Sequence, residues 1–444
     1  MWESVDDNPV FRDLALTYHS SAAVIMIRVS PMPRQKGLAI RFEAQGLILL
    51  VAIFFTLLLV GKTQEPRTSR VIDAPLWKLD VRSLGYTPWN VRESGETPVT
   101  LSQVSFISDA ELAITFVSHI VPEALPRRSE PESANLRLNA LFIDSKSGRV
   151  RGRNEWPTTS ERSRITPAGR GGFLVVTPDK LILTSSGIQP DKELGLPIGR
   201  EALQGWWDAV PSPKGKYLMI WYDAGPQGSI RKWELVDVDN LLIARAFTEP
   251  HLGMSPRAPF DDGTVLATDW EGTVVARLGD VIGAPPDGPW RPDKAPWGAC
   301  RPDRGVTLID DQTILGTGDI MFPQHRWCHT LAQTNGELIF RQEFPEKEQI
   351  ELDAGLGGVA VSAGGERFAV AVYKTRGGSI LLDIGSGRSI DRIMLYDLTV
   401  RRWTYTLDAK KHGLKSLSGV ALSPDGSLLA LIDQQGTLQL YGVP

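Results

Sequence analysis

The sequence has little of three things that would place it in a specialised class of protein. It holds 2 cysteines in 444 residues, too few for a disulfide scaffold or a four-cysteine zinc or iron–sulfur site. Charge of one sign is not in excess, since 48 lysines and arginines stand against 52 acids and leave a net charge of −4. Such a chain has no overall field for nucleic acid, so we expect no nucleic-acid partner.

A long apolar run is also missing, because a full membrane span needs about 20 apolar residues. The longest run is Leu47–Val60, LILLVAIFFTLLLV, in which Thr56 is the only polar residue. Four basic residues lie between positions 28 and 41. A basic flank before a short apolar core is typical of a secretory signal. We therefore predict a short hydrophobic signal or anchor helix within residues 36–62; the alternative is a buried core helix.

The apolar run Leu47–Val60 also predicts the cellular location of the protein. The basic side stays in the cytoplasm, so the large C-terminal part is expected to be extracytoplasmic, in a periplasm or at a cell surface. No small-x-small cleavage site follows Val60, so a cleaved signal and a retained anchor through Leu47–Val60 both stay open. Residues 1–35 match neither a signal nor an anchor, and they are expected to be disordered or to precede the true start. Residues 63–74 are interpreted as a polar linker.

From residue 75 onward the pattern is all-β. Short runs rich in β-branched and aromatic residues alternate with Gly, Pro, Asp and Asn, and no long amphipathic helical pattern occurs. A unit recurs in which a tight turn precedes an apolar strand, as in Ser423-Pro424-Asp425-Gly426 followed by SLLALID. Similar turns fall near positions 110, 171, 215, 263, 312, 365 and 426. Glycine in these turns supplies the positive-φ position of a hairpin.

This spacing favours a β-propeller over residues 75–444, most simply with seven four-stranded blades. The last unit contains too few strands for a whole blade, and an unpaired edge would be a liability. We therefore expect the N-terminal strand near residues 75–82 to close the last blade by pairing near 436–442. Six or eight blades, or a pair of β-sandwiches, are the alternatives.

The ending SPDGSLLALIDQQGTLQLYGVP resembles the final blade of WD-repeat and YVTN-type β-propellers. The resemblance concerns architecture and is specific only in the last 26 residues. The Gly-His and Trp-Asp dipeptides of WD repeats do not occur at the expected strand ends. The resemblance implies a propeller and no particular function.

A few residues could carry chemistry. Cys300 and Cys328 are 28 residues apart and are expected to form a disulfide in an exported protein; two free buried thiols are the alternative. Tryptophans in Pro- and Gly-rich connections could form a contact surface or fill gaps between blades. These are Trp206, Trp207, Trp290 and Trp297.

Other motifs have a simpler explanation in strand and turn structure. His325 and His329 would lie about 13 Å apart on a strand, too far to share a metal. The acid pairs Asp261-Asp262 and Asp310-Asp311 occupy equivalent turn positions, so hairpin chemistry explains them. The glycines between 377 and 387 precede no Lys-Thr or Lys-Ser and read as a hairpin tip. The sequence thus indicates no catalytic, cofactor or metal site.

Two functions remain open. The first is a monomeric binding or scaffold module for a protein or glycan partner. The second is a propeller enzyme, such as a quinoprotein dehydrogenase or a hydrolase, with a site in the axial channel. Acids, His or Arg converging at one mouth of the channel would favour the enzyme, and a chemically mixed mouth the binding module.

Overall fold

The computed structural model describes most of the chain from Arg70 onward, and all these residues belong to the unit Gln64–Pro444. The predicted signal or anchor, and residues 1–35, lie outside the described part. The described residues are 70–85, 103–119, 136–160, 162–169, 172–184, 192–196, 198, 207–224, 230–248, 255–268, 275–278, 300, 305–320, 326–334, 337–344, 348–350, 359–374, 389–414, 417–433 and 435–444.

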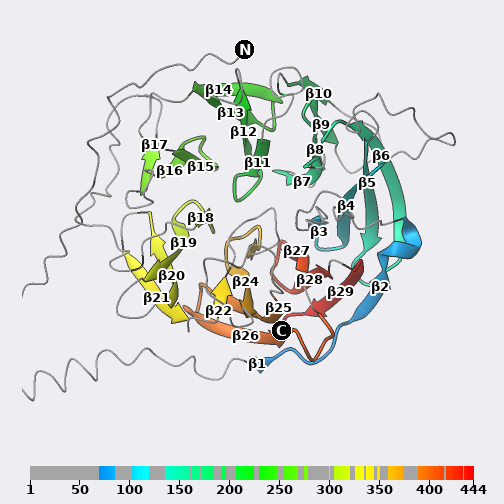
Figure 1. Cartoon of the computed structure of the whole chain (residues 1–444), viewed down its shortest axis with the longest axis vertical. Coiled ribbons are helices and arrows are strands. Elements are labelled where there is room, and N and C mark those ends of the chain that lie inside the picture. The colour runs from blue at the N-terminus through cyan, green and yellow to red at the C-terminus, as the bar shows by residue number, and fades with distance from the viewer. Residues whose placement is uncertain are drawn as a thin grey trace, which may run out of the picture. The chain divides into compact units, whose positions relative to one another are not determined.

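The described strands form sheets placed radially around a common centre (Figure 1), so the all-β propeller prediction is confirmed. The first sheet contains β3 (Gln103–Ser108), β4 (Glu111–His119), β5 (Leu136–Asp144) and β6 (Val150–Thr158). The second contains β7 (Arg164–Ala168), β8 (Gly172–Val176), β9 (Lys180–Thr184) and β10 (Lys192–Gly195). The third contains β11 (Trp207–Pro211), β12 (Tyr217–Ala224), β13 (Ile230–Asp237) and β14 (Leu242–Thr248).

The other sheets follow the same order along the chain. The fourth contains β15 (Ser255–Pro259), β16 (Val265–Thr268) and β17 (Val275–Leu278), and the fifth β18 (Gly305–Leu308), β19 (Thr313–Ile320), β20 (Arg326–Gln333) and β21 (Leu338–Phe344). The sixth contains β22 (Glu348–Ile350), β23 (Val359–Val361), β24 (Arg367–Lys374), β25 (Ser389–Asp397), β26 (Arg402–Asp408) and β1 (Arg70–Val71). The seventh contains β27 (Leu417–Leu422), β28 (Leu428–Asp433), β29 (Thr437–Gly442) and β2 (Trp77–Asp80).

The N-terminal segment closes the ring. Strand β2 pairs antiparallel with β29, with Trp77 opposite Leu440 and Asp80 opposite Thr437, which confirms the predicted closure. A second contact was not predicted: β1 also pairs in parallel with β26 on the neighbouring sheet. The N-terminal segment therefore holds the outer edges of the sixth and seventh sheets together.

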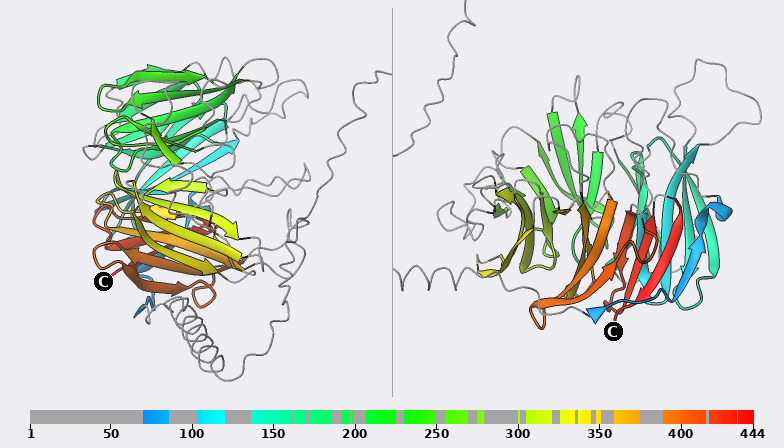
Figure 2. Two further views of the ribbon diagram at one scale, coloured as in Figure 1. Left: turned by 90° about the vertical axis from the view of Figure 1, so that its left-hand side faces the viewer. Right: turned by 60° about the horizontal axis from the view of Figure 1, so that its bottom comes forward.

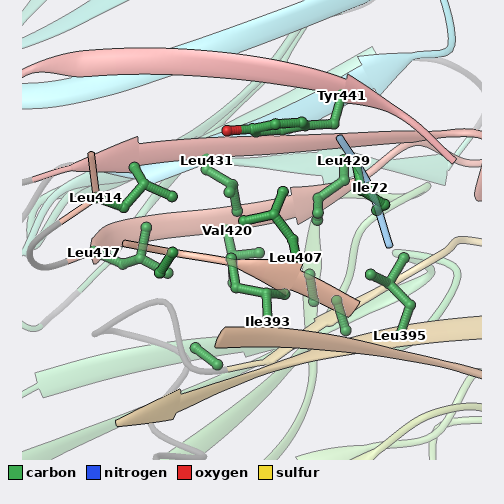
Figure 3. Packing of buried hydrophobic residues seen from close by; sticks show 14 of the residues in the cluster. Ile72, Ile393, Leu395, Leu407, Leu414, Leu417, Val420, Leu429, Leu431 and Tyr441 are labelled. Atoms are coloured by element: carbon green, nitrogen blue, oxygen red, sulfur yellow. The ribbon is translucent and has the colours of Figure 1, made fainter. Parts of the chain in front are cut away.

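The core lies between neighbouring sheets, because inner strands such as β8 and β28 present buried apolar side chains on both faces. Figure 3 shows the cluster between the sixth and seventh sheets, where Ile72 from the N-terminal segment packs with Leu407 and Tyr441. The His412 ring nitrogen Nε2 lies 3.3 Å from the Ile72 carbonyl, and Lys411 pairs with Asp73 at 2.9 Å. The N-terminal segment thus contributes a buried side chain, Ile72, to the core and an exposed ion pair, through Asp73, to the surface.

The two ends of the sheets differ, and Figure 2 shows them edge-on. The turn face carries the hairpins between the first and second strands and, on the first, second, third, fifth and sixth sheets, the hairpin that leads into the outer antiparallel strand; these connections are two to seven residues long. The opposite end, the connection face, carries the connections between the second and third strands, which include residues 120–135 and 375–388. Among the described residues, no helix is long and apolar enough to cross a membrane.

Candidate interaction face

Charged side chains at the connection face lie in separate clusters on different sheets. On the first sheet, Glu155 accepts from Arg137 and Arg153, each at 2.9 Å. Arg153 also donates to Asn139 Oδ1 at 2.8 Å, and Asn139 donates to the Ser118 hydroxyl at 2.8 Å. This chain of contacts leaves one more positive than negative charge, which suits an acidic or hydroxyl-rich ligand group.

The sixth sheet carries a second cluster around one carboxylate. Asp391 lies 2.9 Å from Lys374 Nζ, 2.8 Å from Arg392 Nη1 and 3.9 Å from Lys410 Nζ. Partial burial opposes ionisation of Asp391, but the hydrogen bonds from Lys374 and Arg392 outweigh it and hold its pKa below the usual value. The carboxylate stays charged at neutral pH, and the three cations leave a net positive group.

Further ion pairs occur at the same end of the second and third sheets. Arg164 pairs with Asp208 at 2.5 Å, across the boundary between these sheets. Arg231 pairs with Asp223 at 2.8 Å, and its guanidinium lies 4.9 Å from the Trp221 ring centroid. The described part of this face is therefore polar and chemically mixed. Charges at strand ends are common in any sheet, so the sequence offered no signal for these clusters.

The turn face is built differently, because its inner hairpins bond to one another around the ring. The Asp261 carboxylate accepts from the Ser212 hydroxyl at 2.6 Å and from the Lys214 amide at 3.1 Å. The Asp261 amide in turn donates to Asp311 at 2.8 Å. Further round the ring, the Asp425 amide donates to Asp109 at 3.1 Å.

These contacts explain the acid pairs noted in the sequence. In each pair one carboxylate bonds within its own turn, Asp262 to Thr264 and Asp310 to the Gln312 amide. The other, Asp261 or Asp311, bonds to a neighbouring turn. The acid pairs therefore stabilise their own hairpin turns, as predicted from the sequence, and they also form hydrogen bonds between neighbouring sheets. Gly215 has φ +68°, and a Cβ there would lie 2.9 Å from the Pro167 carbonyl oxygen of the neighbouring sheet.

Trp207 is not the exposed contact residue that one interpretation of the sequence proposed. It is 3% exposed, and its indole N–H donates to the Ser160 hydroxyl at 2.8 Å. The side chain packs in the cluster between the second and third sheets, so it fills a gap between sheets. Trp206, Trp290 and Trp297 lie outside the described residues, as do His325 and the glycines between 377 and 387.

The fifth sheet holds the two cysteines. Cys300, which precedes β18, is bonded to Cys328 in β20 with a Cα separation of 5.8 Å, inside the usual range for a disulfide. These segments are not adjacent strands, so the bond joins the connection before the sheet to its third strand. Both cysteines are fully shielded from solvent.

His329, the residue after Cys328, points into the packing between the fifth and sixth sheets. Its ring lies 5.1 Å from that of Phe344, and neither ring nitrogen has a hydrogen-bond partner in the described structure. Burial lowers the pKa of His329 to about 3, so the ring is neutral at physiological pH. Thr317 and Gln342 flank it on the neighbouring strands. Among the described residues, no three His, Cys, Asp or Glu side chains lie close enough to hold a metal ion.

The similarity of this chain to known proteins is found among solved structures and concerns the fold. No protein-family model and no curated protein matches the sequence. The solved structures that resemble it include the C-terminal WD40 domain of Sif2, at 9% identity and a TM-score of 0.42, covering 85% of this chain and 99% of that domain. They also include the Neurospora crassa Pan2 WD40 domain, at 10% identity and 0.44, covering 84% and 98%. A chain of a mitotic checkpoint complex matches at 12% and 0.44, covering 86% and 96%.

Proposed function

We propose that the chain is an exported or membrane-anchored propeller that binds a protein or glycan partner at its connection face. In this proposal each of the seven sheets is one blade. The run Leu47–Val60 directs export and, if retained, anchors the chain. The protein is extracytoplasmic and monomeric, and the bond between Cys300 and Cys328 forms in that oxidising compartment.

The difference between the two faces supports this proposal most directly. On the turn face, polar groups of the inner hairpins form hydrogen bonds with one another, as Asp261 does with Ser212. On the connection face the charged clusters lie near the strand ends that residues 120–135 and 375–388 connect. Binding residues concentrate on such connections when a rigid scaffold positions them. The clusters sit on different sheets, and each of their carboxylates is paired with a basic side chain, which favours binding over catalysis.

Site-specific photo-crosslinking in cells tests the proposal. A photo-reactive residue would replace Arg231 or Lys374 at the connection face, and Lys214 or Glu366 at the turn face as matched controls. We expect an adduct of one defined mass from the first pair and none from the second. Adducts from the turn-face positions alone would show that the partner binds at the other end of the ring.

A further inference from the structure

Large apolar side chains are exposed at one recurrent position of the propeller. Six of them lie within two residues of the start of an outer strand, at the turn face, whereas Val71 and Ile230 lie elsewhere. Single exposed apolar residues are common on protein surfaces, but the same position repeated on several sheets marks a surface with a shared role. The residues are Leu76 (60% exposed), Val150 (39%), Leu242 (46%), Ile243 (39%), Leu338 (44%) and Val400 (51%).

On three consecutive sheets these apolar residues are flanked by exposed basic side chains. We call this surface the basic arc; it covers the sixth, seventh and first sheets. It comprises Val400 with Arg401 and Arg402, Leu76 with Lys78, and Val150 with Lys146, Arg149 and Arg151.

Two acids beside the basic arc are paired. Asp144 pairs with Arg151. Asp397 is buried and pairs with Arg367 at 3.2 Å. The equivalent residues on the third and fifth sheets have acidic neighbours instead: Asp237 and Asp239 precede Leu242, and Glu337 precedes Leu338. Among the described residues at this recurrent position, the basic neighbours therefore lie on the sixth, seventh and first sheets.

The same side of the ring carries the N-terminal segment. Strands β1 and β2 lie on the outer edges of the sixth and seventh sheets, the first two sheets of the basic arc (Figure 1). Nine residues, 61–69, separate the run Leu47–Val60 from Arg70. An extended chain spans at most about 3.6 Å per residue, so a retained anchor would hold β1 within about 30 Å of the bilayer.

We propose that the basic arc docks on the surface of an anionic lipid bilayer. Basic side chains near a membrane are attracted to anionic head groups, and apolar side chains beside them enter the interface. This inference rests on the proposed anchoring through Leu47–Val60. Docking the turn face would leave the connection face directed away from the lipid and open to a partner.

Lipid-borne quenching of a fluorophore tests the proposal. Both native cysteines are bonded to each other, so an added cysteine is the one thiol open to labelling in the unreduced chain. The full chain carrying Val400→Cys is labelled and reconstituted into nanodiscs that contain quencher-bearing lipids, either with phosphatidylglycerol or with phosphatidylcholine alone. Ile243→Cys is the matched control, because it is exposed at the same recurrent position outside the basic arc.

We expect several-fold stronger quenching at Val400 than at Ile243, and stronger quenching with phosphatidylglycerol. The double change Arg149→Glu and Arg402→Glu should remove the difference, whereas Lys216→Glu, on the turn face outside the basic arc, should not. Equal quenching at both positions, or none at Val400, would overturn the docking. Co-elution of the chain with the nanodiscs reports anchoring separately: a chain that co-elutes without quenching is anchored and not docked. A chain that does not co-elute is neither.

Discussion

The Asp261 carboxylate accepts a 2.6 Å hydrogen bond from the hydroxyl of Ser212, which lies 49 residues earlier on the preceding sheet. The same carboxylate accepts from the Lys214 amide, and Asp261 is only 7% exposed. One side chain thus satisfies two donors of a neighbouring turn in a site shielded from water. Contacts of this kind join inner hairpins of neighbouring sheets at the turn face.

Replacing Asp261 should therefore weaken the whole ring. Asp261→Ala leaves the Ser212 hydroxyl and the Lys214 amide without their acceptor, and hydrogen bonds to a charged group contribute about 1.5–3 kcal/mol each. We expect the free energy of unfolding to fall by about 2–3 kcal/mol in urea titration. Asp237→Ala is the control, since the half-buried Asp237 carboxylate bonds to Asn240 within its own turn. A loss no larger than that of the control would show that the contact between sheets adds nothing to stability.

Closure by the N-terminal strand predicts a second effect. The Trp77 indole N–H donates to the Ser145 carbonyl at 2.8 Å, and its ring covers Gly148, which has φ +68°. A Cβ at Gly148 would lie 2.9 Å from Trp77 Cδ2. Gly148→Ala should cost at least about 1–2 kcal/mol, the strain of a left-handed residue, and should expose Trp77 to fluorescence quenching by iodide. Gly152→Ala, where a Cβ meets nothing within 4 Å, should leave both quantities unchanged.

Buried His329 predicts how stability depends on pH. Its folded pKa is lowered to about 3 by burial, whereas the unfolded chain titrates near 6.5. The unfolded state therefore binds the proton first, and this contribution to stability is complete above about pH 6.5 and is lost as pH falls toward 3. We expect wild type to lose stability relative to His329→Leu by up to about 1.4 kcal/mol per pH unit in that window. Parallel pH profiles for the two proteins would mean that folding does not lower the pKa of His329.

The sequence allowed prediction of those features that local chemistry determines. Gly215 and Gly263 indicated hairpin turns, because the positive φ of such turns favours glycine. The pairing of β2 was predictable because an incomplete last blade requires a closing strand. The contact between Asp261 and Ser212, and the burial of Trp207, depend on how sheets meet across about 50 residues. No local pattern encodes that spacing.

The disulfide predicts a redox-dependent stability. The bond between Cys300 and Cys328 closes a loop of 28 residues, and the chain-entropy model gives about 3–4 kcal/mol for such a loop. The unreduced native protein should resist alkylation, and reduction or the double change Cys300→Ala and Cys328→Ala should lower the free energy of unfolding by that amount. Rapid alkylation of native protein isolated from cells would show that the thiols are free there.

Export is the claim on which the binding face, the disulfide and the basic arc all depend, and a reporter fusion measures it most directly. A reporter that is active only outside the cytoplasm is fused after Arg70, with and without Leu47–Val60. We predict activity for the intact N-terminal segment and none once Leu47–Val60 is deleted. A reporter that stays silent with the intact segment would contradict export and, with it, a membrane-docked propeller.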